Sequence, residues 1–115
     1  MYSAKNGGTA RAEMHADLLS AFSHPARLLI LNAIRMREVN VGELCEICGL
    51  SQSAISQHLA RLRKQGVVKT RRIHQMIFYR LASRDVERLL VVLGEIPGAG
   101  GGAPIDRRSS DLDRK

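Results

Sequence analysis

The chain has few aromatic side chains: its 115 residues include two Phe, two Tyr and no Trp. Any core must therefore be assembled from Leu, Ile, Val, Met and Ala, which favours packed helices over a large sheet. Long apolar runs are also missing, since no stretch approaches the roughly 20 consecutive apolar residues that cross a bilayer, and the first residues lack a signal-peptide hydrophobic segment. We therefore expect a cytoplasmic protein with no membrane partner.

Cysteine is equally scarce, with only Cys45 and Cys48, three positions apart. In a reducing compartment such a pair supplies free thiols or metal ligands more often than a structural disulfide. Four-coordinate zinc needs two further ligands, and the sequence places no histidine beside the pair. Both cysteines fall on an apolar helical stripe with Val41 and Leu44, which favours packing in a core. A metal ion and a reactive sulfur species stay open as effectors, and the sequence identifies no definite cofactor.

Acidic residues are absent from residues 51–80, which we call the acid-free segment and which holds seven Lys and Arg. Residues 10–50, in contrast, hold four basic and five acidic residues. A solvated surface usually mixes both signs of charge. A positive charge concentrated in one segment is typical of nucleic-acid binding.

The two ends of the chain lack helical or strand periodicity. Residues 1–9 carry no apolar pattern, and residues 97–115 are dominated by Gly, Pro, Ser and charged residues, which bury too little apolar surface to offset chain entropy. We predict a flexible N-terminus over 1–9, one folded domain over 10–96 and a flexible tail over 97–115. Because so short a domain buries a limited share of its surface, a partner subunit would stabilise it.

The first part of the domain is predicted to be helical. Apolar residues between Met14 and Phe22 recur at helical spacing, and Pro25 suits the first turn of a second helix. A third helix follows the capping residue Asn40 and ends at Gly49, which can adopt the left-handed conformation of a helix end.

The second part changes from helical to strand periodicity. Ser51 can cap a fourth helix that ends at Gly66, and residues 67–72 and 76–81 then alternate as two strands of a basic hairpin. A last helix starts from a Ser83 cap. The chain is thus mainly α with a small β-hairpin, in the order α-α-α-α-β-β-α. Two helices joined by a short turn and followed by a hairpin form a winged helix-turn-helix.

The fourth helix has a polar face suited to reading DNA. The Gln57 amide can pair with adenine, and the Arg61 guanidinium with guanine or phosphate. Amides at the helix N-terminus favour phosphate. The candidate contacts on this helix are Ser51, Gln52, Ser53, Ser56, Gln57, His58, Arg61 and Lys64. Because His58 adjoins the buried stripe, a packing role is the alternative for that residue.

Three stretches resemble the ArsR/SmtB family of dimeric winged-helix repressors: "SHPARLLILNAI", "VGELCEICGLSQSAISQHLARLRKQGVV" and "TRRIHQMIFYRL". The resemblance spans about residues 14–93 and is strongest to the branch that contains HlyU, BigR and SqrR. It implies a wing that contacts DNA through Arg71, Arg72, His74 and Gln75. It also implies a homodimer whose first and last helices form the interface, with Met14, Leu18, Phe22, Val86, Leu89, Leu90 and Leu93 as the candidate contacts.

The inducer sites of the family are matched poorly by this sequence. Aligned on the helix-turn-helix, the paired cysteines of the metal-sensing members correspond to Asn40 and Gly42, and only Cys45 coincides with a family thiol. The sulfur-responsive branch has a cysteine near Asn32 and another in the last helix, whereas this chain has none after Cys48. The last helix also lacks the histidine of the zinc-sensing type. The resemblance therefore covers DNA reading and leaves the switch undefined.

The sequence predicts a DNA-binding regulator rather than an enzyme, because no nucleophile has a plausible base and no Gly-rich loop lies between a strand and a helix. The favoured function is a repressor that binds a partly palindromic operator as a homodimer and is released by a small inducer or by thiol modification. An activator or anti-silencer that displaces another DNA-bound protein is the alternative. Two distant alternatives belong to other classes. A CxxC thiol oxidoreductase would need a βαβ context, which the sequence does not predict, and a basic RNA-binding protein would usually show stacking aromatic residues.

Overall fold

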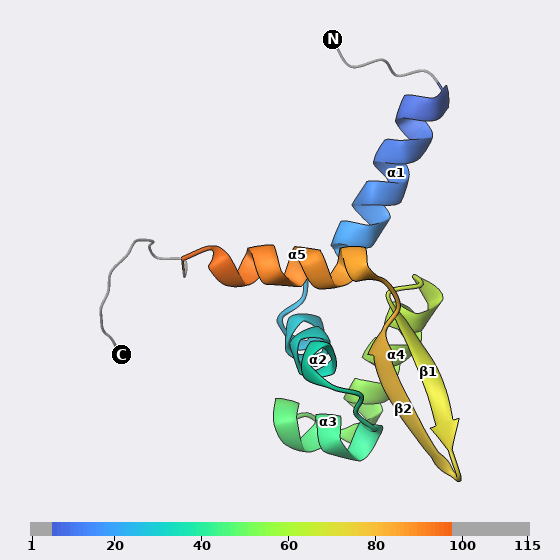
Figure 1. Ribbon diagram of the computed structural model, residues 1–115, viewed down its shortest axis with the longest axis vertical. Coiled ribbons are helices and arrows are strands. Elements are labelled where there is room, and N and C mark those ends of the chain that lie inside the picture. The colour runs from blue at the N-terminus through green and yellow to red at the C-terminus, as the bar shows by residue number, and fades with distance from the viewer. Residues whose placement is uncertain (1–5, 98–115) are drawn as a thin grey trace.

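The computed structural model describes residues 6–97 and contains five helices and one antiparallel hairpin in that part of the chain (Figure 1). The predicted order α-α-α-α-β-β-α is confirmed. The elements are α1 (Asn6–Ser20), α2 (Pro25–Met36), α3 (Val41–Cys48), α4 (Gln52–Lys64), β1 (Val68–Ile73), β2 (Met76–Leu81) and α5 (Arg84–Glu95).

The first helix starts earlier than the sequence pattern indicates. It begins at Asn6, inside the segment 1–9 that was expected to be flexible. Extending an existing helix costs far less than nucleating one, so a helix can continue into residues that carry no apolar pattern. Residues 1–5, and residues 98–115 of the expected flexible tail, lie outside the described residues. No helix within 6–97 is long and apolar enough to cross a membrane.

Local capping chemistry fixes the helix starts as predicted. The side chains of Asn40, Ser51 and Ser83 accept hydrogen bonds from backbone amides of the first turns of α3, α4 and α5. Asn40 and Glu43 form a reciprocal capping box, which satisfies two amides that a helix start otherwise leaves unpaired. Gly49 ends α3 with φ 68°, in the left-handed region that favours glycine.

The core lies where α2, α3, α4, the base of the hairpin and α5 meet. Its largest fully buried side chains are Ile30, Leu31, Leu44, Ile55, Leu59, Leu62, Val39 and Val67. Three of them come from α4, so the apolar side of α4 is fixed rigidly in the core. Its opposite side is thereby held outward at a defined angle.

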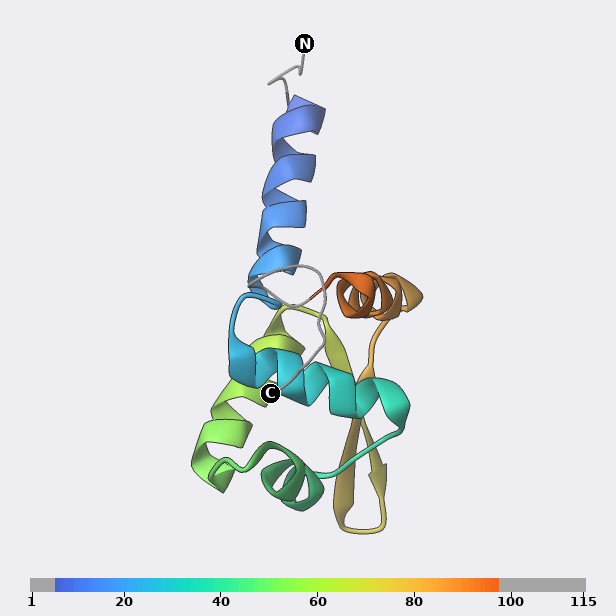
Figure 2. The ribbon, with the colours of Figure 1, turned by 90° about the vertical axis from the view of Figure 1, so that its left-hand side faces the viewer.

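Helix α1 projects from this body, at the end opposite the tip of the hairpin (Figures 1 and 2). Its described contacts with the body lie near its C-terminal end. There Ala21 and Phe22 enter the core, and the Gln65 amide donates hydrogen bonds to Ser20 Oγ at 2.9 Å and to the Asp17 carbonyl at 3.2 Å. Most of α1 is exposed, including Met14 at 66%. A helix of this length is marginal in water without packing, so it needs a covering surface.

Candidate nucleic-acid interface

The predicted reading helix presents its polar residues together on the outer face of α4. The hydroxyl of Ser51 accepts from the amide of Ala54 at 3.1 Å and fixes the helix start directly after the turn. Ile55, Leu59 and Leu62 occupy the opposite side and are at most 1% exposed. The exposed predicted contacts are Ser51, Gln52, Ser53, Ser56, Gln57, Arg61 and Lys64. The structure therefore gathers seven of the eight candidates of α4 on accessible surface.

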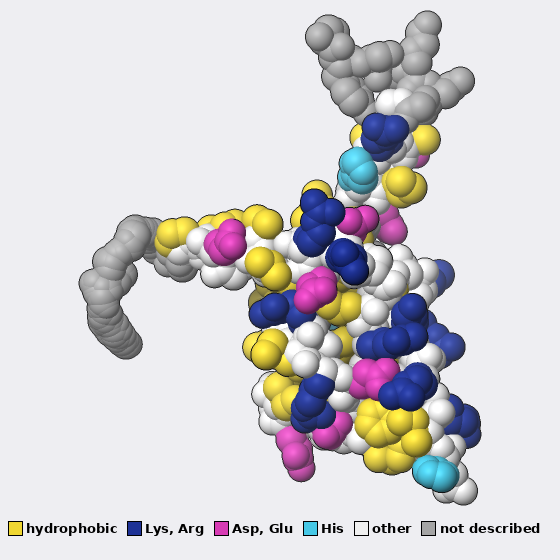
Figure 3. Space-filling model, in the orientation of Figure 1, with side chains coloured by type: hydrophobic (Ala, Val, Ile, Leu, Met, Phe, Trp, Pro, Cys, Tyr) yellow, Lys and Arg dark blue, Asp and Glu magenta, His cyan; other side chains and the backbone are white. Residues whose placement is uncertain are grey.

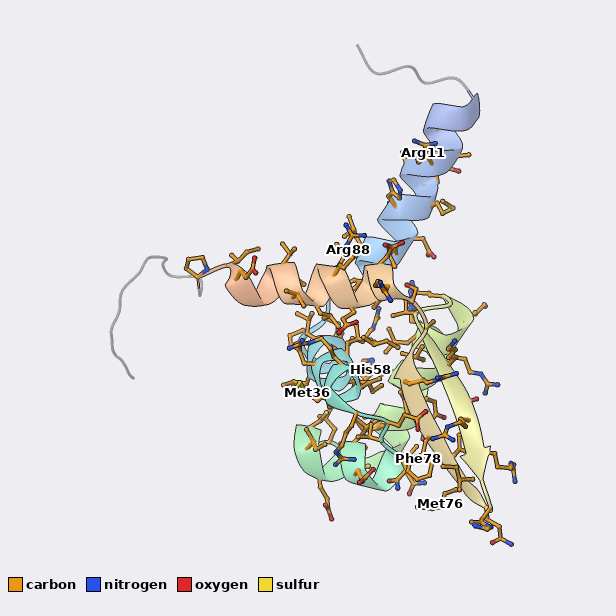
Figure 4. The ribbon with its side chains drawn as sticks, in the orientation of Figure 1. Arg11, Met36, His58, Met76, Phe78 and Arg88 are labelled. Carbon is orange, nitrogen blue, oxygen red and sulfur yellow. The ribbon has the colours of Figure 1, made fainter. Side chains whose placement is uncertain are left out.

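His58 differs from these seven because it packs inside the protomer (Figure 4). Its ring is half-buried and meets the ring of His24 edge-on, with centroids 4.7 Å apart. Nδ1 of His24 in turn accepts from the amide of Ala26 at 3.1 Å and caps α2. His58 thus joins the reading helix to the start of α2, which favours the packing alternative over a DNA contact.

This histidine pair predicts a pH dependence of stability. Burial lowers the pKa of His58 below its ordinary value, and the nearby His24 and Arg27 add to the decrease. The unfolded chain then binds a proton at His58 more readily than the folded chain does. We expect unfolding free energy to fall as the pH decreases through about 6.5, the ordinary histidine pKa.

The measurement is urea denaturation between about pH 7.5 and pH 5.5, above the range where carboxylates titrate. His58→Gln should reduce the pH dependence over this interval. His74→Asn is the matched control, because His74 is exposed at the hairpin tip away from this pair and asparagine tolerates its positive φ. An unchanged slope in His58→Gln would contradict the prediction.

The wing places its basic residues on both faces of the hairpin. In the antiparallel register Arg71 lies opposite Phe78, and Arg72 lies opposite Ile77. Because side chains of adjacent residues point to opposite faces, Arg71 and Arg72 diverge. The guanidinium of Arg71 forms an ion pair with Glu38, whereas Arg72 is exposed and has no recorded partner within residues 6–97.

The tip of the wing consists of His74 and Gln75, and both are exposed. His74 has φ 57°, the only positive φ of a non-glycine residue in the described part of the chain. A non-glycine residue in this region is strained, which constrains the hairpin tip. The tip therefore extends two polar side chains beyond the last strand pair.

Lys and Arg side chains gather over the hairpin and along its outer edge, on the side away from the free end of α5 (Figure 3). Arg63 of α4 and Lys69 of β1 are exposed basic residues that were not among the predicted contacts. Both belong to the acid-free segment, so its charge pattern was the signal that could have identified them. The combined surface is suited to a polyanion.

The two cysteines lie on the inward side of α3. Cys45 and Cys48 are half-buried free thiols that pack against the core beside buried Leu44. Burial raises the pKa of Cys48, and Cys45 adds to the rise. A thiol with a raised pKa is a weak nucleophile at neutral pH. Within residues 6–97 no group of three or more His, Cys, Asp and Glu could hold a metal ion.

The residues predicted to form the dimer interface separate into two groups. Phe22, Val86 and Leu90 are at most 8% exposed and belong to the protomer core, so these three cannot present a free contact surface. Leu18 and Leu89 are half-buried, and Met14 and Leu93 are exposed.

A hollow of about 500 Å³ lies between α1 and α5, next to Arg88 (Figure 4). Its lining residues are His15, Leu18, Leu19, Asp85, Arg88, Leu89 and Val92. Leu18 and Leu89 of the predicted interface thus face this hollow.

The α3–turn–α4 unit and the hairpin behind it define a winged helix-turn-helix protein. The sequence profile described as "Bacterial regulatory protein, arsR family" matches residues 24–70, which contain α2, α3, α4 and the start of the wing. The protein belongs to this family. The prediction made from the three sequence stretches is confirmed.

Named relatives include a transcriptional activator and a repressor. The nodulation protein NolR of Rhizobium meliloti is 48% identical over 87 residues, which are 76% of this chain and 71% of NolR. The transcriptional activator HlyU of Vibrio cholerae is 46% identical over 66% of this chain and 70% of its own length. The biofilm growth-associated repressor of Xylella fastidiosa is 41% identical over 72% of this chain and 73% of its own length.

Solved structures agree with the fold. The crystal structure of NolR from Sinorhizobium fredii matches with a TM-score of 0.75 and 44% identity, covering 83% of this chain and 95% of that one. A winged helix-turn-helix DNA-binding domain from Mycobacterium bovis, described as homodimeric, matches with a TM-score of 0.73 and 26% identity, covering 82% and 87% of the two chains.

Proposed function

We propose that the protein is a transcriptional repressor that binds a partly palindromic DNA operator as a homodimer. The observation that carries this proposal is the rigid outward presentation of the polar face of α4, beside a hairpin that carries the positive charge. The apolar side of α4 is fixed in the core, so the polar side chains of α4 would meet a major groove at one angle. A regulator of this kind works where the bacterial chromosome lies, in the cytoplasm.

The homodimer is supported by the exposed length of α1. Met14 and Leu19 are more than half exposed on a helix that projects from the protomer, and the hollow between α1 and α5 adds further apolar surface. A second copy related by a two-fold axis would cover both. The symmetry would then place two copies of α4 in successive major grooves, about 34 Å apart.

Activation is the second candidate function. The HlyU relative is named an activator, and the repressor relative is similar to this chain to a comparable degree. An anti-silencer would use the same α4 surface and the same kind of site, and would differ only in what it displaces. Both functions therefore share one DNA-binding test.

The experiment is selection of duplexes from a random library by the full-length protein, followed by footprinting of the selected duplex. We expect an enriched sequence with two related half-sites about one helical turn apart. A shuffled duplex of the same composition and a duplex RNA competitor serve as controls. Equal binding to selected and shuffled duplexes, or preference for RNA, would contradict the proposal.

The release mechanism is tested through the cysteines. Because Cys48 is half-buried and its pKa is raised, we expect the Cys45→Ser/Cys48→Ser variant and the wild type to respond alike to persulfide, peroxide, arsenite and zinc in duplex-binding assays. The measurement is the dissociation constant for the selected duplex with and without each reagent. Release of the wild type that the double variant lacks would identify the pair as a sensor.

A further inference from the structure

The short connection between α2 and α3 forms part of the wing sheet. The backbone of Val39 pairs with Tyr79 on β2: the Val39 amide donates to the Tyr79 carbonyl at 3.2 Å, and the Tyr79 amide donates to the Val39 carbonyl at 2.7 Å. Val39 is completely buried. The residue before it, Glu38, is therefore held beside β2 and its side chain points to the opposite face.

That opposite face carries two arginines of the hairpin. Arg71 lies opposite Phe78, and Arg80 lies two residues further along the same strand as Phe78, so the three side chains share one face. Figure 4 places Phe78 on the hairpin between its base and the tip, with Met76 nearer the tip. A single carboxylate at position 38 thus faces two guanidinium groups.

Glu38 engages Arg71 through both carboxylate oxygens. Nε of Arg71 donates to Oε2 at 3.1 Å, and the terminal nitrogen of Arg71 donates to Oε1 at 2.5 Å. Nε of Arg80 lies 3.9 Å from Oε2. The hydrogen bond from Arg71 lowers the pKa of Glu38, so the carboxylate is charged at neutral pH. Two-point pairing of this kind fixes orientation as well as distance.

The ion pair with Glu38 distinguishes Arg71 from the other basic residues of the wing. Two N–H donors of the Arg71 guanidinium are taken by Glu38, and the carboxylate offsets its positive charge, so Arg71 is a weaker phosphate ligand than an unpaired arginine. Arg72 and Lys69 are exposed and have no recorded partner within residues 6–97. We propose that Glu38 is a positioning residue that fixes the wing through Arg71, and that Arg72, on the opposite face of the hairpin, contacts DNA phosphate instead of Arg71.

This assignment rests on the proposed DNA-binding function and replaces the direct role expected for Arg71. Two kinds of variant separate the roles. A residue that neutralises one phosphate contributes about 0.9 to the slope of the logarithm of affinity against the logarithm of salt concentration. A residue that acts through wing position changes affinity and leaves this slope unaltered.

The experiment measures affinity for the selected duplex over a range of salt concentrations. We expect Glu38→Gln and Arg71→Ala each to weaken binding about threefold to tenfold with an unchanged slope. Arg72→Ala should make the negative slope shallower by about 0.9. The charge-exchanged variant, Glu38→Arg with Arg71→Glu, should recover most of the affinity. Glu46→Gln is the matched control, because it removes the same charge from the exposed side of α3.

A second measurement does not depend on DNA. In hydrogen exchange, Glu38→Gln should speed exchange of the Val39 and Tyr79 amides, while Glu46→Gln leaves them as in the wild type. Three results would overturn the assignment: tighter duplex binding by Glu38→Gln, a shallower salt dependence for Arg71→Ala, or unchanged exchange of the Val39 and Tyr79 amides in Glu38→Gln. If the wild type selects no duplex, the proposed function fails, and the exchange result alone still decides whether Glu38 holds the wing.

Discussion

Replacing Leu62 by alanine should destabilise the folded protein by about 3 kcal/mol. Leu62 is fully buried among residues of the core. Truncation to alanine removes its apolar contacts and leaves a cavity that the surrounding helices fill only in part, which typically costs 2 to 5 kcal/mol. Because Leu62 packs the inner side of α4 against the core, loss of this packing also makes the position of the outer, polar face of α4 less rigid.

Urea denaturation at one fixed protein concentration measures this effect, since the stability of a dimer depends on concentration. Leu29→Ala is the matched control: it deletes the same atoms from a side chain that is 50% exposed, and should cost much less. Equal losses in the two variants would mean that Leu62 is not part of a close-packed core.

Replacing Arg61 by alanine should weaken binding to the selected duplex by about 1 to 3 kcal/mol and relax the base preference at one position of each half-site. Arg61 is exposed on the outer face of α4, directly beside buried Leu62 in the sequence. Within α4, adjacent residues can therefore separate recognition from stability. The free energy of unfolding of Arg61→Ala should stay close to that of the wild type.

Competition between the selected and the shuffled duplex tests the role of Arg61. Arg61→Lys is the informative control, because lysine keeps the charge for phosphate but lacks the planar fork that pairs with guanine. We expect the lysine variant to keep general DNA affinity and lose base preference. If Arg61→Ala loses the same affinity on both duplexes, Arg61 contacts phosphate only.

Several features of the fold follow from short stretches of sequence. Asn40 and Ser51 cap their helices through side chains that reach amides three residues away, and Gly49 ends α3 because glycine tolerates positive φ. The change from helical to alternating periodicity after Gly66 predicted the hairpin. These signals are readable because each depends on residues that are neighbours in the chain.

Other features were predicted only in part, because they depend on which elements pack together. The apolar stripes of the first and last helices were assigned to a dimer interface, yet Phe22, Val86 and Leu90 fill the protomer core. A stripe shows that a helix face is buried and does not say against what. Only burial in the three-dimensional structure separates these residues from exposed Met14 and Leu93.

The sequence by itself determined the class of this protein: the helix order, the caps, the hairpin and the acid-free segment are all local patterns. Only the tertiary structure decided which polar side chains of that segment are free to meet DNA. His58 is engaged by His24, and Arg71 by Glu38, a residue 33 positions away in the chain. Such pairs depend on how α2 and its following loop pack against α4 and the wing. No periodicity within a single segment encodes that arrangement.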